Sequence, residues 1–166
     1  MKAIRYTQYG PPDVLQFVDV EKPTPKDDEV LVKIHAASVN ALDWHLLTAD
    51  IFLIRVSGEG MFKPKRSRLG ADMAGRVEAV GSAVTQFKPG DAVYGDIEPF
   101  GSGALAEYAA VPATELAPKP ASLTFAEAAA LPVAALTALQ GLRDVGKIQA
   151  GQRVLINGAS GGVGTF

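Results

Sequence analysis

The feature that most constrains the fold lies at the end of the chain, where glycines recur at every third position. The spacing is Gly158-x-x-Gly161-x-x-Gly164, and it directly follows Arg153–Asn157, an apolar run typical of a buried parallel strand. Glycines after such a strand let backbone N–H groups approach a pyrophosphate at the start of a helix. The pattern therefore predicts the opening of a dinucleotide-binding α/β unit. A plain glycine-rich turn between a strand and a helix is the alternative.

The expected loop lies near the start of such a domain in the sequence. The helix that should follow it, and the residue about 20 positions on that contacts the ribose, do not occur within the 166 residues. Each further strand–helix unit takes roughly 25–30 residues, so on the order of 125–150 residues of a cofactor domain are absent. We therefore expect this chain by itself to be an inactive fragment, and the choice between NAD and NADP stays open.

Two helices are predicted upstream of that strand. Thr124 and Glu127 have the spacing of a capping box, and Pro132 suits the first turn of a second helix. Gly146 is placed to end this second helix. Its apolar stripe comprises Val133, Leu136, Leu139, Leu142 and Val145. Without a sheet to cover it, the stripe predicts association, poor order or docking onto the first domain.

The chain up to residue 121 has a different sequence pattern, in which short apolar runs are separated by Gly and Pro. In the clearest run, Val30–Ala36, every second residue is apolar, while Lys33 and His35 lie on the other face. Further strands are expected at Lys2–Tyr6, Gly75–Val80, Asp91–Gly95 and Ala104–Val111. Several short strands at this spacing favour a small barrel or sandwich. We place a domain boundary between 1–121 and 122–166, and expect the insert Leu46–Leu69 to be partly helical.

Composition excludes several classes of protein. With 48% hydrophobic residues the chain can bury a core, and with no cysteine it has no disulfide framework, thiol nucleophile or cysteine-bound zinc. The net charge of −2 gives no reason to expect nucleic acid as a partner. The N-terminus lacks a secretory signal, and the apolar stretch Ala126–Leu142 is too short to span a membrane. We expect a cytoplasmic protein without a membrane partner.

Several segments together resemble the medium-chain dehydrogenase/reductase superfamily, particularly its zinc-independent, quinone oxidoreductase-like branch. The matching segments are MKAIRYTQYGPPDVLQF, EVLVKIHAASVNALDWHLL, LGADMAGRVEAVG, FKPGDAVYGD, GALAEYAAVP, and AAALPVAALTALQGL leading into GQRVLINGASGGVG. They cover nearly the whole chain in the family's order. The resemblance implies a mainly β GroES-like barrel as the catalytic domain, 1–121, followed by the truncated start of an α/β Rossmann domain, 122–166.

Departures from the zinc enzymes indicate the branch. Asn40 stands where zinc-dependent members have a cysteine ligand, and Ala71 stands where they have a histidine ligand. The cysteine-rich loop of the structural zinc has no counterpart. A catalytic zinc needs three protein ligands, and the chain offers only His35 and His45 as imidazoles. We therefore expect no metal site and no zinc.

The resemblance implies an NAD(P)H-dependent oxidoreductase that reduces quinones or α,β-unsaturated carbonyl compounds by hydride transfer without zinc. It places Asn40, Asp43 and His45 at the bottom of the substrate cleft. Asn40 would donate a hydrogen bond to the substrate oxygen, and His45 would deliver a proton. The cofactor, NADPH or NADH, would contact Thr137 and the loop Gly158, Ala159, Ser160, Gly161, Gly162, Val163 and Gly164. The expected partner is a small carbonyl or quinone substrate, with a homodimer in the full-length protein.

Plainer interpretations stand beside these. Asn40 and Asp43 also suit a turn after a strand, His45 a surface position, and Thr137 a hydrogen bond to its own helix. The basic residues Lys63, Lys65, Arg66 and Arg68 suggest a phosphate contact, but a solvated loop is the better interpretation. Two other functions also remain open. One is a zinc-dependent alcohol dehydrogenase, and the other is a stand-alone GroES-like binding module without catalysis.

Overall fold

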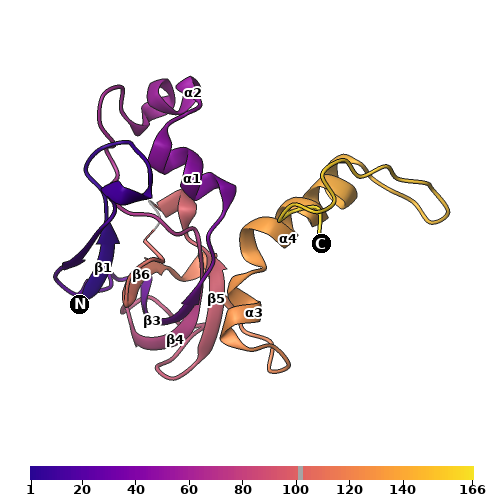
Figure 1. Ribbon diagram of the computed structural model, residues 1–166. Coiled ribbons are helices and arrows are strands. Elements are labelled where there is room, and N and C mark those ends of the chain that lie inside the picture. Colours follow the sequence, from indigo (N-terminus) through magenta and orange to yellow (C-terminus); the bar gives the residue numbers. More distant parts are fainter. Residues whose placement is uncertain (101–102) are drawn as a thin grey trace.

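The chain forms a body rich in β-strands, followed by helices and an extended C-terminal segment (Figure 1). Figure 1 is a computed structural model, which describes residues 1–100 and 103–166, apart from the side chains of residues 57, 58 and 100. The C-terminal segment, drawn in yellow, extends away from the body on the side of the last helix. No helix in the described residues is both long and apolar enough to cross a membrane.

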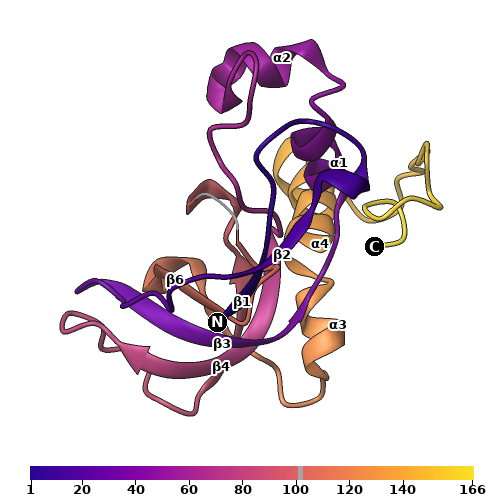
Figure 2. The ribbon, with the colours of Figure 1, turned by 60° about the vertical axis from the view of Figure 1, so that its left-hand side comes forward.

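In the described residues, seven strands build two antiparallel sheets. The larger sheet has the order β6-β3-β4-β5-β7, and the smaller one pairs β1 with β2. Their bounds are β1 Lys2–Arg5, β2 Gln16–Asp19, β3 Glu29–Ala37, β4 Asp72–Val80, β5 Ala92–Asp96, β6 Tyr108–Pro112 and β7 Ala117–Pro118. Figure 2 shows that β3 and β4 are long and strongly curved. The expected strands are therefore present, although β6 begins four residues later than the sequence suggested, and β2 and β7 were not predicted.

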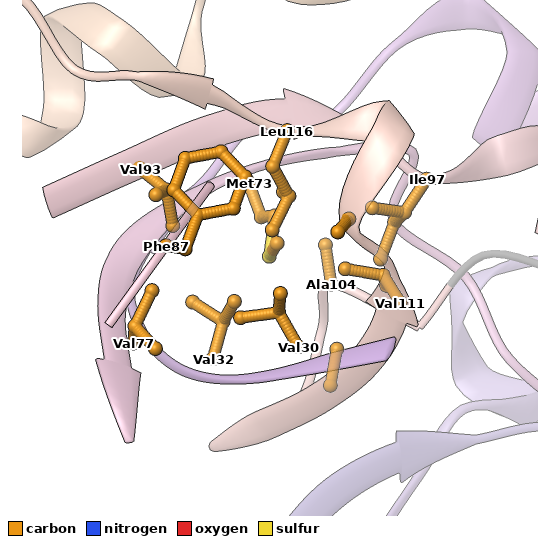
Figure 3. Packing of buried hydrophobic residues seen from close by; sticks show 12 residues of the cluster. Val30, Val32, Met73, Val77, Phe87, Val93, Ile97, Ala104, Val111 and Leu116 are labelled. Carbon is orange, nitrogen blue, oxygen red and sulfur yellow. The ribbon is translucent and has the colours of Figure 1, made fainter. Parts of the chain in front are cut away.

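The main core lies against the larger sheet, as the alternation in β3 predicted. Val30 and Val32 are completely buried, whereas Lys33 and His35 are exposed. Figure 3 shows these valines facing Met73 of β4 and the side chains that cover the sheet. The cluster comprises Val30, Val32, Met73, Val77, Phe87, Val93, Ile97, Ala104, Ala109, Val111, Ala113 and Leu116.

A second apolar cluster holds the first helix against the N-terminal segment. Tyr6, Leu46, Leu47 and Leu69 are its buried members. They join α1, Ala41–Thr48, to residues on either side of it in the sequence. The insert is partly helical, as predicted: α2 spans Phe52–Ile54 and continues into a wider turn at Arg55–Glu59. In both Figure 1 and Figure 2, α2 and α3 lie at opposite ends of the molecule.

The two helices predicted after residue 121 are confirmed. In α3, Phe125–Ala129, the Thr124 hydroxyl accepts from the Glu127 N–H at 3.2 Å, and the Glu127 carboxylate accepts from the Thr124 N–H at 2.8 Å. Pro132 begins α4, Pro132–Leu139, which continues as a wider turn over Gln140–Val145 to Gly146. Ala128 and Ala129 are buried against Ala74 of β4, which anchors this region to the sheet.

The prediction of a buried strand at Arg153–Asn157 is wrong. These residues adopt no strand conformation and are exposed, with Leu155 94% accessible to solvent. A parallel strand is stabilised by neighbours on both edges and by helices on both faces. None of the described segments pairs with residues 153–157, so their backbone groups face solvent instead.

Candidate functional site

A buried carboxylate organises the polar centre of the molecule. Asp72, the first residue of β4, is completely buried. One of its oxygens, Oδ2, accepts from the Ser38 hydroxyl at 2.7 Å and from the Asn40 side-chain amide at 3.0 Å. The other, Oδ1, accepts from the backbone N–H of Val133 at 2.9 Å. Asp72 therefore joins the end of β3, the start of α1 and the start of α4.

Asn40 lies at this junction, immediately before α1. Its Nδ2 atom is 3.0 Å from the Asp72 carboxylate and 3.3 Å from the Ser38 oxygen. Because the Ser38 and Asp72 oxygens are themselves 2.7 Å apart, both lie on the same side of Nδ2 and share one amide hydrogen, and the second amide hydrogen points away from them. The Ser38 contact is the longer and weaker of the two, because hydrogen bonds weaken as the donor–acceptor distance approaches 3.5 Å.

Asp43 is buried as well, and it bonds to the backbone. Its carboxylate accepts from the Asn40 N–H at 2.8 Å, which caps α1, and from the Gly70 N–H at 2.7 Å. Gly70 has a φ of +93°, and a Cβ there would lie 2.7 Å from the Leu105 nitrogen. Only glycine fits that position. Through its two hydrogen bonds, Asp43 fixes both the turn that leads into β4 and the backbone of Asn40.

His45 stands apart from this junction. Its Nδ1 atom is 2.9 Å from a carboxylate oxygen of Asp50, and both side chains are partly exposed. The hydrogen bond from His45 holds the pKa of Asp50 below its usual range. The structure thus brings Asn40 and Asp43 together, whereas His45, on the same helix, bonds to the loop after α1.

Thr137 lies one turn along α4 from Val133. Its hydroxyl donates to the Val133 carbonyl at 2.6 Å, which is the hydrogen bond within the helix that the sequence offered as the plainer interpretation. The same residue lines a hollow of about 490 Å³ between α4 and the glycine-rich end. The glycine-rich residues that line it are Gly158, Gly161, Gly162, Val163 and Gly164. Thr137 and most of the expected cofactor loop therefore share one hollow, while Ala159 and Ser160 are not among its lining residues.

The glycine-rich loop forms successive turns. The Gly161 N–H donates to the Gly158 carbonyl at 2.9 Å, and the Thr165 N–H donates to the Gly161 carbonyl at 3.0 Å. A Cβ at Gly164 would lie 2.3 Å from the Gly158 oxygen, so the turn requires glycine there. In contrast, nothing lies within 4 Å of a Cβ built on Gly162, which leaves that side of the loop open to a ligand.

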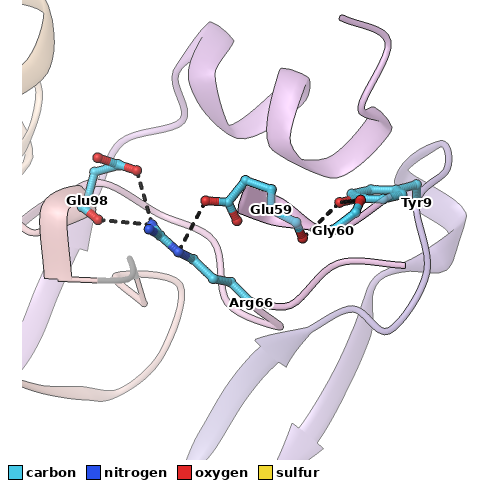
Figure 4. Close-up of polar contacts among 5 residues, drawn as sticks. All are labelled: Tyr9, Glu59, Gly60, Arg66 and Glu98. Atoms are coloured by element: carbon cyan, nitrogen blue, oxygen red, sulfur yellow. Dashed lines mark hydrogen bonds and ion pairs between the residues drawn. The ribbon is translucent and has the colours of Figure 1, made fainter. Parts of the chain in front are cut away.

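Polar contacts anchor the insert that carries Glu59 and Arg66 (Figure 4). Arg66 bonds to the carboxylates of Glu59, at 3.3 Å, and Glu98, at 3.2 Å. The Tyr9 hydroxyl donates to the backbone carbonyls of Glu59 and Gly60. Arg66 is thus neutralised by carboxylates, whereas Lys63 and Lys65 are exposed, as expected for a solvated loop.

Burial affects the titration of one nearby aromatic residue. Tyr6 is 1% exposed, and desolvation, together with the charge of Glu59, raises its pKa to about 12. Its phenol is therefore neutral at physiological pH. Regarding metal ligands, residues 1–100 and 103–166 bring no three His, Cys, Asp or Glu side chains close enough together to hold an ion.

Sequence reasoning did not identify Asp72 or Ser38. The available signal was an acidic residue in the otherwise uncharged run Leu69–Gly75, where an ionised group is costly to bury unless it is hydrogen-bonded. A hydroxyl and an amide two residues apart, Ser38 and Asn40, were the complementary donors. Only the antiparallel register of β3 and β4, which pairs Ala37 with Met73, brings these groups together.

Comparisons with known proteins agree with this architecture. Residues 26–121 match the family described as the alcohol dehydrogenase GroES-like domain. The chain is 41% identical to a chloroplastic quinone-oxidoreductase homolog of Spinacia oleracea, covering 100% of the chain and 50% of that protein. It is 45% identical to a 2-methylene-furan-3-one reductase of Solanum lycopersicum, of which it covers 42%.

Solved structures show the same fold. A quinone oxidoreductase of Escherichia coli, determined in complex with NADPH, superposes with a TM-score of 0.82 at 28% identity over 99% of the chain and 47% of that protein. The expected mainly β, GroES-like fold class is therefore confirmed. The chain spans about half the length of the curated relatives it matches.

Proposed function

The chain belongs to the alcohol dehydrogenase GroES-like domain family, within the quinone oxidoreductase-like branch of the medium-chain dehydrogenase/reductase superfamily, and from this premise we propose its function. The whole protein is an NAD(P)H-dependent reductase of quinones or α,β-unsaturated carbonyl compounds that works without zinc. Residues 1–121 form its catalytic domain, and residues 122–166 open its cofactor domain. Relatives named as quinone oxidoreductases and as a reductase of a 2-methylene-furan-3-one support this assignment.

One observation carries the proposal: the groups needed for substrate and cofactor follow one another along α4. Asn40 meets the first turn of that helix through Asp72 and the Val133 N–H. Thr137 lies one turn further along, and the glycine-rich hollow borders the same helix. A dinucleotide bound along α4 would thus lead from the glycines to Asn40.

The residues of the hollow fit part of a nicotinamide dinucleotide. The hollow has a volume of about 490 Å³, within the usual range for small-molecule sites, and it is lined by glycines, which have no side chains to obstruct a ligand. When bound, the reduced nicotinamide supplies the hydride. The Thr137 hydroxyl oxygen keeps lone pairs that would accept from a carboxamide N–H, and the backbone N–H groups of Gly162 and Gly164 would contact the phosphates.

Asn40 acts on the substrate oxygen. As the carbonyl or quinone accepts a hydride, negative charge develops on that oxygen, and a fixed donor stabilises it. The amide hydrogen that points away from Ser38 and Asp72 is the one that hydrogen-bonds to the substrate oxygen. Asp43 holds the Asn40 backbone in place through its capping hydrogen bond of 2.8 Å.

A proton completes the reduction, and we assign its delivery to His45. The Asp50 carboxylate fixes the ring through Nδ1, and Nε2 is the atom that exchanges the proton. The substrate gains one hydride and one proton, which gives a hydroquinone from a quinone or a saturated carbonyl from an enone.

We further propose a cytoplasmic homodimer. Two relatives carry chloroplastic and mitochondrial names, which makes subcellular fractionation the direct check of location.

The test is NADPH oxidation by the full-length protein with a simple quinone and a simple enone as acceptors. Asn40→Ala should lower kcat by about 100-fold, since it removes the donor to the developing negative charge. Gln86→Ala, which removes an exposed amide elsewhere, serves as the matched control and should leave kcat unchanged. An Asn40→Ala protein with normal kcat would contradict the assigned role, and a full-length protein that never oxidises NADPH would instead favour a binding module.

A further inference from the structure

We propose that Asp72 is the positioning residue of this site: it sets the direction in which the Asn40 amide points and holds α4 against it. The proposal rests on the proposed function for its catalytic consequence. Its structural part, the orientation of Asn40 by Asp72, stands on the hydrogen bonds alone.

The three donors to Asp72 come from two separate segments, the turn between β3 and α1 and the start of α4. They are the Ser38 hydroxyl, the Asn40 amide and the Val133 backbone N–H, at 2.7, 3.0 and 2.9 Å. Among the described side chains, no Lys, Arg or His forms an ion pair with Asp72, although it is completely buried. A buried carboxylate that is held only by hydrogen-bond donors forces those donors to converge on it.

The carboxylate determines the orientation of Asn40. An Asn side chain has a donor and an acceptor end of nearly equal shape, and its hydrogen-bond partners decide between them. Because a carboxylate only accepts, it selects the orientation with Nδ2 toward Asp72. The reverse orientation would place two acceptor oxygens face to face at about 3 Å.

The second oxygen of Asp72 fixes α4. Val133 lies in the first turn of that helix, where backbone N–H groups lack partners within the helix. A carboxylate there also interacts favourably with the positive end of the helix dipole. One side chain therefore sets both the direction of Asn40 and the position of α4, and with it the distance from Asn40 to Thr137.

The side-chain amide of Asn40 can be observed directly. The chain contains only two asparagines, Asn40 and Asn157, so labelling with a nitrogen isotope only at asparagine gives two side-chain amide signals in an NMR spectrum. Asn157 is exposed and serves as the internal reference. We expect the Asn40 amide hydrogens to exchange with solvent about tenfold or more slowly than those of Asn157. Equal rates would overturn the proposal.

Substitutions then distinguish protection of the Asn40 amide by Asp72 from protection by burial alone. Asp72→Asn should bring the Asn40 exchange rate to within about twofold of Asn157, because an amide no longer selects one orientation. Asp96→Asn is the matched control: Asp96 pairs with Asp72 in the register of β4 and β5 and bonds to the Glu98 N–H instead. Protection of Asn40 that survives Asp72→Asn, or that is lost equally in Asp96→Asn, would overturn the proposal.

A third variant covers the case in which Asp72→Asn does not fold. Ser38→Ala removes the longer contact of Asn40 and one donor to Asp72, but it leaves the hydrogen bond between Asn40 and Asp72. Asn40 should therefore stay protected in Ser38→Ala. Loss of protection down to the rate of Asn157 would assign the orientation to Ser38 and overturn the role of Asp72.

Kinetics of the full-length protein test the catalytic consequence. Asp72→Asn should lower kcat for a quinone about tenfold or more while the quinone KM stays within about twofold, since a misdirected donor affects the transition state more than binding. An unchanged kcat would overturn this consequence. If the unsubstituted protein reduces neither quinones nor enones, the proposed function fails, and the exchange comparison still decides whether Asp72 orients Asn40.

Discussion

Two apolar runs of similar composition reach opposite outcomes in this molecule. Val30–Val32, in β3, is buried between β4 and β6. Val154–Ile156, near the C-terminal end, is exposed and forms no strand. Both are short stretches of Val, Leu and Ile, so their intrinsic preference for extended structure is alike.

The difference shows what an apolar run requires to become a strand. The residues of β3 have partners on both edges, which satisfy their backbone groups and cover their side chains. Residues 153–157 have no such partners among the described segments. Strand formation is therefore decided by neighbours, and sequence preference only makes it possible.

The largest expected difference between the two regions lies in stability. Met73→Ala, in the completely buried core, should lower the free energy of unfolding by about 2–5 kcal/mol, because it leaves a cavity. Leu155→Ala, at a side chain 94% exposed, should change it by less than about 0.5 kcal/mol. Urea denaturation of the 166-residue chain measures both. Comparable losses would mean that the C-terminal run is buried in solution.

A smaller effect is expected at the start of α3, the first helix after residue 121. Thr124→Ala removes the capping hydroxyl of α3 and should cost about 1 kcal/mol. Thr165→Ala, whose hydroxyl bonds within an exposed terminal turn, is the matched control and should cost almost nothing. Circular dichroism during urea denaturation reports both. An equal effect of the two substitutions would show that α3 is not stabilised by its capping box.

The smallest effect concerns pH, and it has opposite signs in the two regions. Burial raises the pKa of Asp96 above its ordinary value of 3.8. The protonated carboxyl therefore contributes stability at low pH, and this contribution is lost as pH rises from 3.8 through the raised pKa. The hydrogen bond from Arg143 lowers the pKa of exposed Asp144, so its contribution is present at neutral pH and is lost as pH falls.

Substitution of each aspartate tests these signs. Asp96→Asn should raise Tm at pH 7 by roughly 1 °C and have little effect at low pH, because it removes the cost of a partly buried charge. Asp144→Asn should lower Tm slightly at pH 7. Thermal unfolding at neutral and acidic pH measures the two shifts. A fall in Tm for Asp96→Asn at pH 7 would mean that its hydrogen bond to Glu98 outweighs desolvation.

Much of the local structure could be predicted from the sequence. The reciprocal pair Thr124 and Glu127, and the proline at position 132, mark the helix starts because their hydrogen-bonding and φ preferences act within one turn. The alternation in Val30–Ala36 predicted a half-buried strand for the same local reason. The strand at 153–157 was predicted wrongly, because its formation depends on partners distant in the chain.

The candidate site shows the same division. The resemblance indicated Asn40, Asp43 and Thr137, which the structure places along α1 and α4. Asp72 was missed because its partners, Asn40 and Val133, are 32 and 61 residues away. Nothing in the spacing of these residues reveals that they share one carboxylate.

The sequence by itself determined the helix caps, the faces of the strands and the family to which the chain belongs. These properties depend on neighbours within a few residues, or on an order of segments that can be compared directly. Only the tertiary structure decided which buried carboxylate receives the Asn40 amide and which apolar run becomes a strand. Both require groups from separate segments to satisfy one another, because a buried charge or a strand edge is stable only when partners from elsewhere in the fold reach it.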